Sequence, residues 1–281
     1  MQEPILSTTQ VKTFHEQGFL VLPQFYGVAT EIEPIQRGIH AIIGLVIRSR
    51  NLPIRQQPFS SDSFDSGYRE VIATDRALGG LIYDAAKQIP AFVRLIGKAE
   101  HEGIFRQLRN TDLPGVAAGG SGIRIDNPGE EKYRAPWHQE YPAQLRSLDG
   151  LIFWSPLLRI TPALGPVEIC VGSHKGGLVR VHTRDPANPD KGGAYALILE
   201  KEPELLARYP HVAPLTGPGD LILMDWLTLH ASGMNRDSRA RWAMQLRYFN
   251  FNDPTGIRID WRGSFAAGVS LRDIHPELVI D

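Results

Sequence analysis

The sequence predicts a mainly β fold, a sandwich or barrel, preceded by a layer of helices. From residue 120 onward, short strand-like runs are separated by Gly, Pro and Asn, namely SGIRID, GLIFWSPLL, VEICVG, DLILMDW and RWAMQLRYFNF. Short strands at such spacing are typical of all-β folds. Because most of these runs have no helix of βαβ length between them, a doubly wound parallel sheet is disfavoured.

The first hundred residues are predicted to be mainly helical. The motif STTQ at residues 7–10 is typical of a capped helix start, and Gly18 ends this helix before the strand-like run FLVLPQFY. A second helix is predicted from about residue 30 to residue 49, where isoleucines repeat with the helical period. LGGLIYDAAKQIPAFVRLIG predicts a third helical segment, and the polar RQQPFSSDSFDSGYRE before it is interpreted as a mobile loop. A short helix is expected at KEPELLARYP.

The composition is that of an ordinary soluble protein, with 42% apolar residues, 22% charged residues and a formal net charge of -1 over 281 residues. Lys and Arg form no basic run, so neither nucleic acid nor an anionic membrane surface is an expected partner. No apolar run approaches the ~20 residues that cross a bilayer. The N-terminal segment has no secretion or import pattern, and we therefore expect a cytoplasmic protein.

Several common enzyme classes lack their sequence signals in this chain. There is no GxxxxGK[ST] phosphate loop, no HExxH, no CxxC and no GxSxG. The glycines at 119, 120 and 122 precede a strand instead of opening a helix, so we interpret them as a loop. The single cysteine, Cys170, lies in the apolar run VEICVG and is interpreted as a buried structural thiol.

The triplet His138-Gln139-Glu140, in APWHQEY, is the first candidate for a metal site. If the segment is extended, the imidazole and the carboxylate point to the same face and Gln139 points to the other. An H-x-[DE] triplet is common by chance, so this signal alone is weak.

A second segment, GPGDLILMDWLTLHASGMNRDSRARWAMQLRYFNF, delivers another histidine after an apolar strand. His230 would complete two histidines and one carboxylate on one face of a metal, which is the triad that leaves positions open on ferrous iron for a co-substrate and oxygen. Taken alone, His230 fits a buried, hydrogen-bonded core histidine equally well.

Arg241 begins the next strand and is a candidate anchor for a co-substrate carboxylate. A planar guanidinium matches the two oxygens of a carboxylate, such as the distal one of 2-oxoglutarate. Alternation along the strand puts Gln245 and Arg247 on the same face as Arg241, so all three are expected to line one cavity. The alternative is a surface arginine.

Together these segments resemble the phytanoyl-CoA dioxygenase-like branch of the ferrous iron and 2-oxoglutarate-dependent oxygenases. STTQVKTFHEQGFLVLPQFY resembles the helix-then-strand start of that family, APWHQEY its WHQD segment, and LGPVEICVGSHKGG its NGPLRVVPGSHKGG segment. GDLILMDWLTLHASGMNRDSRARWAMQLRYF is similar to the block that carries the last metal ligand and the co-substrate arginine. Four segments in the right order are far more specific than any one motif.

The resemblance implies a double-stranded β-helix, the cupin-like jelly roll, in a single oxygenase domain. Residues 1–118 would form a mainly helical support and lid. Residues 119–252 would form the jelly-roll core with an insertion at 176–212, and residues 253–281 a C-terminal extension.

The resemblance also implies the roles of the site residues. His138, Glu140 and His230 would bind Fe(II), while Arg241, together with Ser232, would bind the distal carboxylate of 2-oxoglutarate. O2 would be the second co-substrate. The departure from the family is Glu140, because the family has Asp there. Glu is one methylene longer, so either the backbone must sit back or the side chain must fold to reach the same ion.

Other positions match the family less specifically. Arg124 and Asp126, on one face of GIRIDNP, match a strand that often contributes co-substrate or substrate contacts. His174, in VGSH, matches a position that is not a ligand, and we interpret it as organising its loop. Val171 replaces the proline of the family's PGSH.

The expected reaction is hydroxylation of an unactivated C–H bond of a small metabolite or natural-product intermediate, with release of succinate and CO2. Desaturation, epoxidation and cyclisation start from the same oxidant. Side chains expected at the substrate, as partners of an acidic group or of an apolar body, are Arg124, Asp126, Arg134, Trp137, Tyr141, Trp154, Gln245 and Arg247. The alternatives are a cupin-like enzyme that uses another divalent metal and a non-catalytic binding protein in which Glu140 is not a ligand.

Overall fold

Two antiparallel sheets form the centre of the molecule. The computed structural model describes residues 4–185, 196–263 and 268–280. The larger sheet has the order β1-β9-β4-β11-β2, and β3 also pairs with β11. The smaller sheet has the order β10-β5-β8, beside a β6-β7 pair. The strands are β1 Phe19–Leu22, β2 Pro114–Val116, β3 Gly122–Asp126, β4 Gly150–Pro156, β5 Val167–Cys170, β6 Val181–His182, β7 Ile198–Leu199, β8 His211–Val212, β9 Leu221–Asp225, β10 His230–Ser232 and β11 Arg241–Asn250.

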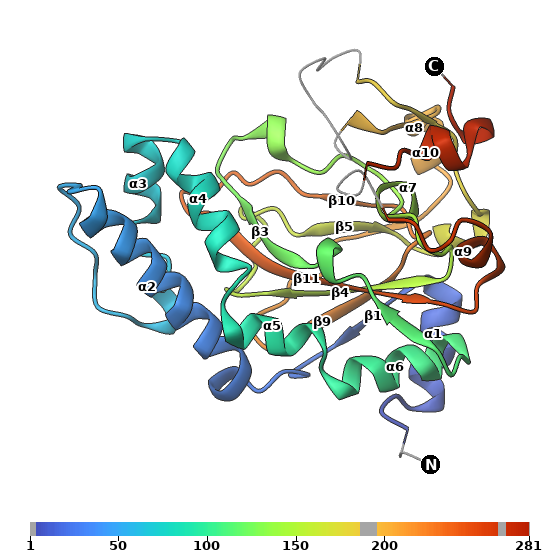
Figure 1. The fold of residues 1–281 in the computed structure, drawn as a ribbon, viewed down its shortest axis with the longest axis horizontal. Coiled ribbons are helices and arrows are strands. Elements are labelled where there is room, and N and C mark those ends of the chain that lie inside the picture. Colours follow the sequence, from blue (N-terminus) through green and yellow to red (C-terminus); the bar gives the residue numbers. More distant parts are fainter. Residues whose placement is uncertain (1–3, 186–195, 264–267, 281) are drawn as a thin grey trace.

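Helices flank these sheets, and Figure 1 shows α2, α3 and α4 gathered at one end of the larger sheet, away from α9 and α10. The prediction of a mainly β jelly roll with an N-terminal helical layer is thereby confirmed. The helices are α1 Thr8–Gln17, α2 Glu33–Ser49, α3 Tyr68–Thr74, α4 Ala77–Ala86, α5 Pro90–Ile96, α6 Ala99–Arg109, α7 Tyr141–Gln144, α8 Glu202–Leu206, α9 Pro254–Arg258 and α10 Leu271–Ile274.

The predicted first helix and strand are present where the capping motif placed them. Ser7 accepts a hydrogen bond from the backbone of Gln10, whose side chain in turn accepts one from the backbone of Ser7. This reciprocal capping box stabilises the first turn of α1. Gly18 ends the helix with φ 78°, a conformation that glycine adopts without steric cost. β1 follows directly and pairs with β9 at the edge of the larger sheet.

The next predicted helical segments are present, but one of them is two helices, and the segment predicted to be a loop contains helical turns. A π-helical turn at Val28–Ile32 leads into α2. The segment LGGLIYDAAKQIPAFVRLIG forms two helices, α4 and α5, because Pro90 has no N–H to continue a helix and disfavours helical geometry in the residue before it. RQQPFSSDSFDSGYRE is not simply a loop: it contains a 3-10 turn at Ser61–Ser63 and the start of α3.

That segment is also tied to the sheet by Asp65. Its carboxylate forms an ion pair with Arg239 at 2.7 Å and accepts a hydrogen bond from the indole nitrogen of Trp242 at 3.1 Å. Trp242 is fully buried at the start of β11 and contacts the ring of Tyr68. The helical layer is therefore fixed to the strand that carries Arg241.

The five strand-like runs predicted from residue 120 onward form β3, β4, β5, β9 and β11, and the expected short helix is α8. β11 lies between β4 on one side and β3 and β2 on the other. Of the insertion predicted at 176–212, residues 186–195 lie outside the described residues, and the rest includes β6, β7, α8 and β8. None of the helices in the described residues is long and apolar enough to cross a membrane.

Candidate metal centre

Two histidines from distant segments are held side by side by their own backbones. The N–H of His138 donates to the carbonyl of His230 at 3.0 Å, and the N–H of His230 donates to the carbonyl of His138 at 3.1 Å. This bridge attaches the APWHQEY segment to β10, which pairs with β5 in the smaller sheet. The imidazole rings consequently lie 4.2 Å apart between centroids.

Both imidazoles present a free nitrogen in the same direction. Nδ1 of His138 lies 2.7 Å from the carbonyl of Pro136, and Nδ1 of His230 lies 2.9 Å from the carbonyl of Thr228. Because a carbonyl can only accept a hydrogen bond, each Nδ1 carries the proton and each Nε2 keeps its lone pair. Backbone carbonyls in this position are the usual means of orienting a metal-binding histidine.

The carboxylate of Glu140 lies close to both imidazole nitrogens, but the backbone conformation of this residue differs from the predicted one. The expectation of an extended segment is wrong at this residue, because Glu140 has helical dihedrals (φ -69°, ψ -37°) and directly precedes α7. Its N–H donates to the carbonyl of Trp226 at 2.8 Å, which fixes the start of that helix. One carboxylate oxygen, Oε2, lies 3.8 Å from Nε2 of His138 and 3.7 Å from Nε2 of His230.

The Glu140 carboxylate is buried and charged. It is 3% exposed, and its other oxygen, Oε1, accepts a hydrogen bond from Nε of Arg247 at 2.6 Å. Burial raises the pKa of Glu140, but the charge of Arg247 and the contacts with His138 and His230 together outweigh burial and hold the pKa well below its usual range. Burial, followed by the charge of His138, lowers the pKa of His230 and favours its neutral, metal-binding form. An anionic oxygen and a neutral imidazole are the protonation states that metal binding needs.

The three predicted ligands thus form one metal site. Nε2 of His138, Nε2 of His230 and a carboxylate oxygen of Glu140 all lie within 4.8 Å of one another. The two imidazoles and one carboxylate fit ferrous iron, whose oxygenase sites use this donor set and keep other positions open.

Arg241 is buried at the start of β11, and two of its nitrogens have no partner among the described residues. The side chain is 1% exposed, and its Nη2 donates to Asp126 at 2.7 Å and to the hydroxyl of Ser232 at 2.9 Å. Nε and Nη1 are buried and have no hydrogen-bond partner among the described residues. Buried donors of a charged group are costly to leave unpaired, so they fit an anionic ligand such as a carboxylate.

A cavity of about 270 Å³ opens beside the metal ligands. Of the predicted substrate or co-substrate residues, the cavity is lined by Arg124, Trp154, Ser232, Gln245 and Arg247. Arg241 was expected to line the same cavity and is not among these residues, but it contacts the hydroxyl of Ser232, which is. Three further lining residues, Tyr83, Lys87 and Gln144, were missed by the sequence reasoning. The i, i+4 spacing of Tyr83 and Lys87 puts them on one helix face. Only the packing of α4 near β3 shows which way that face points.

Four predicted substrate residues, Asp126, Arg134, Trp137 and Tyr141, are not among those that line the cavity. Asp126 is held by two arginines, Arg124 at 2.6 Å and Arg241 at 2.7 Å. Burial raises the pKa of Asp126, but these two cations keep it below its usual value. Asp126 therefore positions the arginines and is not free to contact a substrate. Trp137 contacts the ring of His211 instead of the cavity.

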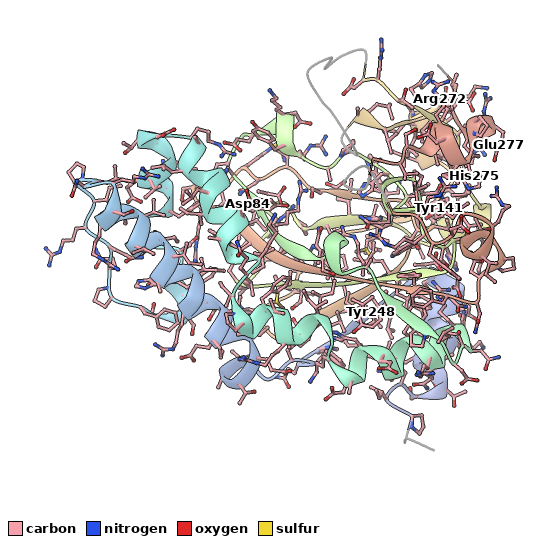
Figure 2. All side chains as sticks on the ribbon, in the orientation of Figure 1. Asp84, Tyr141, Tyr248, Arg272, His275 and Glu277 are labelled. Atoms are coloured by element: carbon pink, nitrogen blue, oxygen red, sulfur yellow. The ribbon has the colours of Figure 1, made fainter. Side chains whose placement is uncertain are left out.

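Tyr141 follows Glu140 but points toward the C-terminal segment. Its hydroxyl lies 2.6 Å from Nε2 of His275, and Nδ1 of His275 lies 2.9 Å from a carboxylate oxygen of Glu277. Figure 2 shows these three residues grouped beside α10. Tyr141 is fully buried, so the prediction of a substrate contact is corrected to a packing role for this side chain. Arg134 likewise lies outside the lining, with one nitrogen donating to the carbonyl of Ser232 at 3.0 Å.

The residues interpreted as structural have structural contacts. Cys170 is fully buried, and burial raises the pKa of its thiol to about 11, which disfavours a reactive thiolate. Nε2 of His174 donates to the carbonyl of His15 at 3.2 Å, which joins the turn at Ser173–Gly176 to the end of α1. The glycine loop leads into β3 and opens no long helix.

The fold and the site together define a non-haem iron oxygenase. The family model for phytanoyl-CoA dioxygenase (PhyH) matches residues 14–243, and the chain belongs to this family. Members are iron- and 2-oxoglutarate-dependent oxygenases, so the predicted enzyme class and cofactors are confirmed. No curated protein sequence matches the chain.

Solved structures confirm the fold at low sequence identity. SnoK, a non-heme alpha-ketoglutarate-dependent carbocyclase from nogalamycin biosynthesis, is 19% identical with a TM-score of 0.55, covering 88% of this chain and 85% of SnoK. EctD from S. alaskensis, with 2-oxoglutarate and 5-hydroxyectoine, is 20% identical with a TM-score of 0.58, covering 90% of this chain and 79% of EctD. EvdO2 from Micromonospora carbonacea var. aurantiaca, complexed with 2-oxoglutarate, is 16% identical with a TM-score of 0.51, covering 87% of this chain and 91% of EvdO2.

Proposed function

We propose that this protein hydroxylates an unactivated C–H bond of a small polar metabolite or natural-product intermediate. The observation that carries the proposal is the convergence of two oriented imidazole nitrogens and one buried carboxylate oxygen within 4.8 Å, at the wall of a cavity. Ferrous iron bound there would supply, with 2-oxoglutarate and O2, an oxidant that removes hydrogen from a C–H bond, with succinate and CO2 as by-products.

The side chains of this chain would divide the work as follows. His138, His230 and Glu140 hold the ion. Arg241 offers its buried guanidinium, two nitrogens of which have no partner among the described residues, to the distal carboxylate of 2-oxoglutarate. The hydroxyl of Ser232, which already accepts from Arg241, is the second contact to that group. Asp126 accepts a hydrogen bond from the same nitrogen, Nη2, and so helps to hold the guanidinium in place.

The size and lining of the cavity support a small polar substrate. About 270 Å³ is at the small end for a ligand pocket, and 2-oxoglutarate must share that space. The wall combines the indole of Trp154 with the polar groups of Lys87, Arg124, Gln144 and Gln245. We propose that Tyr83 on α4 and Lys87, which directly follows α4, form part of a lid supplied by the helical layer, within a single domain. A cytoplasmic location is part of the same proposal.

One assay tests this function against its alternatives. The metal-free protein is titrated anaerobically with Fe(II), mixed with 2-oxoglutarate, and exposed to O2 while succinate is measured. We expect iron-dependent succinate even without substrate, because such enzymes turn over slowly when uncoupled. Succinate that appears with no iron dependence, or no succinate at all, would leave a non-catalytic protein or one that uses another metal.

A further inference from the structure

The two carboxylate oxygens of Glu140 have different neighbours. Oε2 faces the two imidazole nitrogens at 3.7 and 3.8 Å, whereas Oε1 accepts a hydrogen bond from Nε of Arg247 at 2.6 Å. A carboxylate can bind a metal ion through one oxygen or through both. The contact with Arg247 therefore decides how many oxygens of Glu140 face the metal position.

Arg247 is itself held in place along the whole guanidinium group. Its Nη1 donates to the carbonyl of Gly120, and its Nη2 donates to the side-chain oxygen of Gln245 at 3.0 Å. The backbone N–H of Arg247 also donates to the hydroxyl of Ser121 at 3.3 Å. Because each guanidinium nitrogen has a protein partner, Arg247 is committed to this network and is not a free cation for a substrate.

The glycine loop at residues 119–122 provides two of the contacts that hold Arg247. A Cβ at Gly120 would collide with the side-chain oxygen of Gln144. The carbonyl of Gly120 accepts a hydrogen bond from Nη1 of Arg247. The loop therefore sets the position of the guanidinium that reaches Glu140.

We propose that Arg247 is a positioning residue that restricts Glu140 to a single metal-facing oxygen. Glu has one more rotatable bond than the Asp of the family motif, so its carboxylate has more freedom to turn both oxygens toward an ion. A second oxygen on the ion would occupy a position that the co-substrate needs, because this kind of triad works through its open positions. Arg247 thus compensates for the longer ligand. The inference rests on the proposed iron and 2-oxoglutarate chemistry.

The test is a double-mutant cycle between Arg247→Met and Glu140→Asp, with Mn²⁺ as the metal and no turnover. Calorimetry measures first Mn²⁺ binding to the metal-free protein and then 2-oxoglutarate binding to the Mn²⁺-loaded protein. With Glu140 present, Arg247→Met is expected to weaken 2-oxoglutarate binding about tenfold or more while Mn²⁺ binding is kept. In the Glu140→Asp background, the shorter carboxylate loses contact with Arg247, so the same substitution should cost at most about threefold.

The control is Arg146→Met, which removes a nearby cation that binds the carbonyl of Gln144 and makes no contact with Glu140. It should leave 2-oxoglutarate binding unchanged. Arg247→Lys keeps the charge without the fixed fork, and it supplies the same comparison if Arg247→Met does not fold. Equal losses in the Glu and Asp backgrounds, or no loss in either, would overturn the positioning role. Absence of Mn²⁺ binding by the unaltered protein would instead overturn the metal site and with it the proposed function.

Discussion

The two ends of the cavity are held by different kinds of contact. At the metal end, His138, Glu140 and His230 are fixed by backbone hydrogen bonds. The helix end is formed by Tyr83 of α4 and by Lys87, the residue that follows this helix. Tyr83 is 40% exposed, and Lys87 pairs with Asp84, whose side chain is 72% exposed. Figure 2 shows Asp84 in the opposite half of the molecule from Tyr141 and His275. A rigid metal end and an adjustable helix end fit an enzyme whose chemistry is fixed and whose substrate selection is set by the helical layer.

The largest effect should come from removing a metal ligand. His230→Ala is expected to weaken Fe(II) binding by at least about 100-fold, because a missing ligand costs no less than a missing orienting group. Isothermal titration of the metal-free protein measures this. His174→Ala is the matched control, since His174 lies in the turn at Ser173–Gly176 and its ring donates a hydrogen bond to the carbonyl of His15. Equal losses in the two variants would place the metal elsewhere.

The next effect concerns Arg241, a buried cation that contacts Ser232 at the cavity wall. Arg241→Met is expected to weaken 2-oxoglutarate binding by about 2–5 kcal/mol, the cost of truncating one partner of a buried charge pair. Binding to the Mn²⁺-loaded protein gives the value. Arg239→Met, which breaks the ion pair with Asp65 outside the cavity, should lower stability and spare 2-oxoglutarate binding. An unchanged affinity in Arg241→Met would move the anchor to another residue.

A smaller effect is expected at Tyr141, which adjoins Glu140 but faces away from the cavity. Tyr141→Phe removes the hydroxyl that contacts His275 at 2.6 Å and leaves the ring in place. The free energy of unfolding should fall by about 1–3 kcal/mol, because His275 loses a buried partner. Urea denaturation measures that loss, while 2-oxoglutarate affinity should hold. The reverse pattern, a weaker affinity for 2-oxoglutarate with an unchanged free energy of unfolding, would show that Tyr141 contacts the cavity.

The smallest effect is expected at the helix end. Lys87→Ala breaks an ion pair with the exposed Asp84 at 2.8 Å. Exposed i, i+3 pairs contribute little, so the free energy of unfolding should change by less than about 0.5 kcal/mol. Asp84→Ala should give the same small value. A loss of several kcal/mol in the lysine variant would show that this end is as tightly fixed as the metal end.

The sequence indicates the metal end better than the helix end for a physical reason. His138, Glu140, His230 and Arg241 lie in motifs whose residue types follow from the chemistry that they perform. Even there the backbone conformation predicted for Glu140 was wrong. Alternation along a strand assumes an extended backbone, whereas α7 begins directly after Glu140. Tyr83 and Lys87 carry no such motif, since their place at the cavity depends on how α4 packs near β3.

Arg247 shows a further limit of sequence reasoning. Alternation along β11 correctly put it on the face of the cavity, and the expectation of a substrate contact followed from its charge. The structure pairs that charge with Glu140 instead. A pairing across 107 residues has no local sequence signal, so only the assembled sheet reveals it.

The most direct test of the metal centre is a crystal structure of the protein with Fe(II) and 2-oxoglutarate, prepared without O2. We expect iron, located by its anomalous scattering, to contact Nε2 of His138, Nε2 of His230 and Oε2 of Glu140, with the distal 2-oxoglutarate carboxylate on the guanidinium group of Arg241 and the hydroxyl of Ser232. Iron bound elsewhere, or bound without Glu140, would contradict the account.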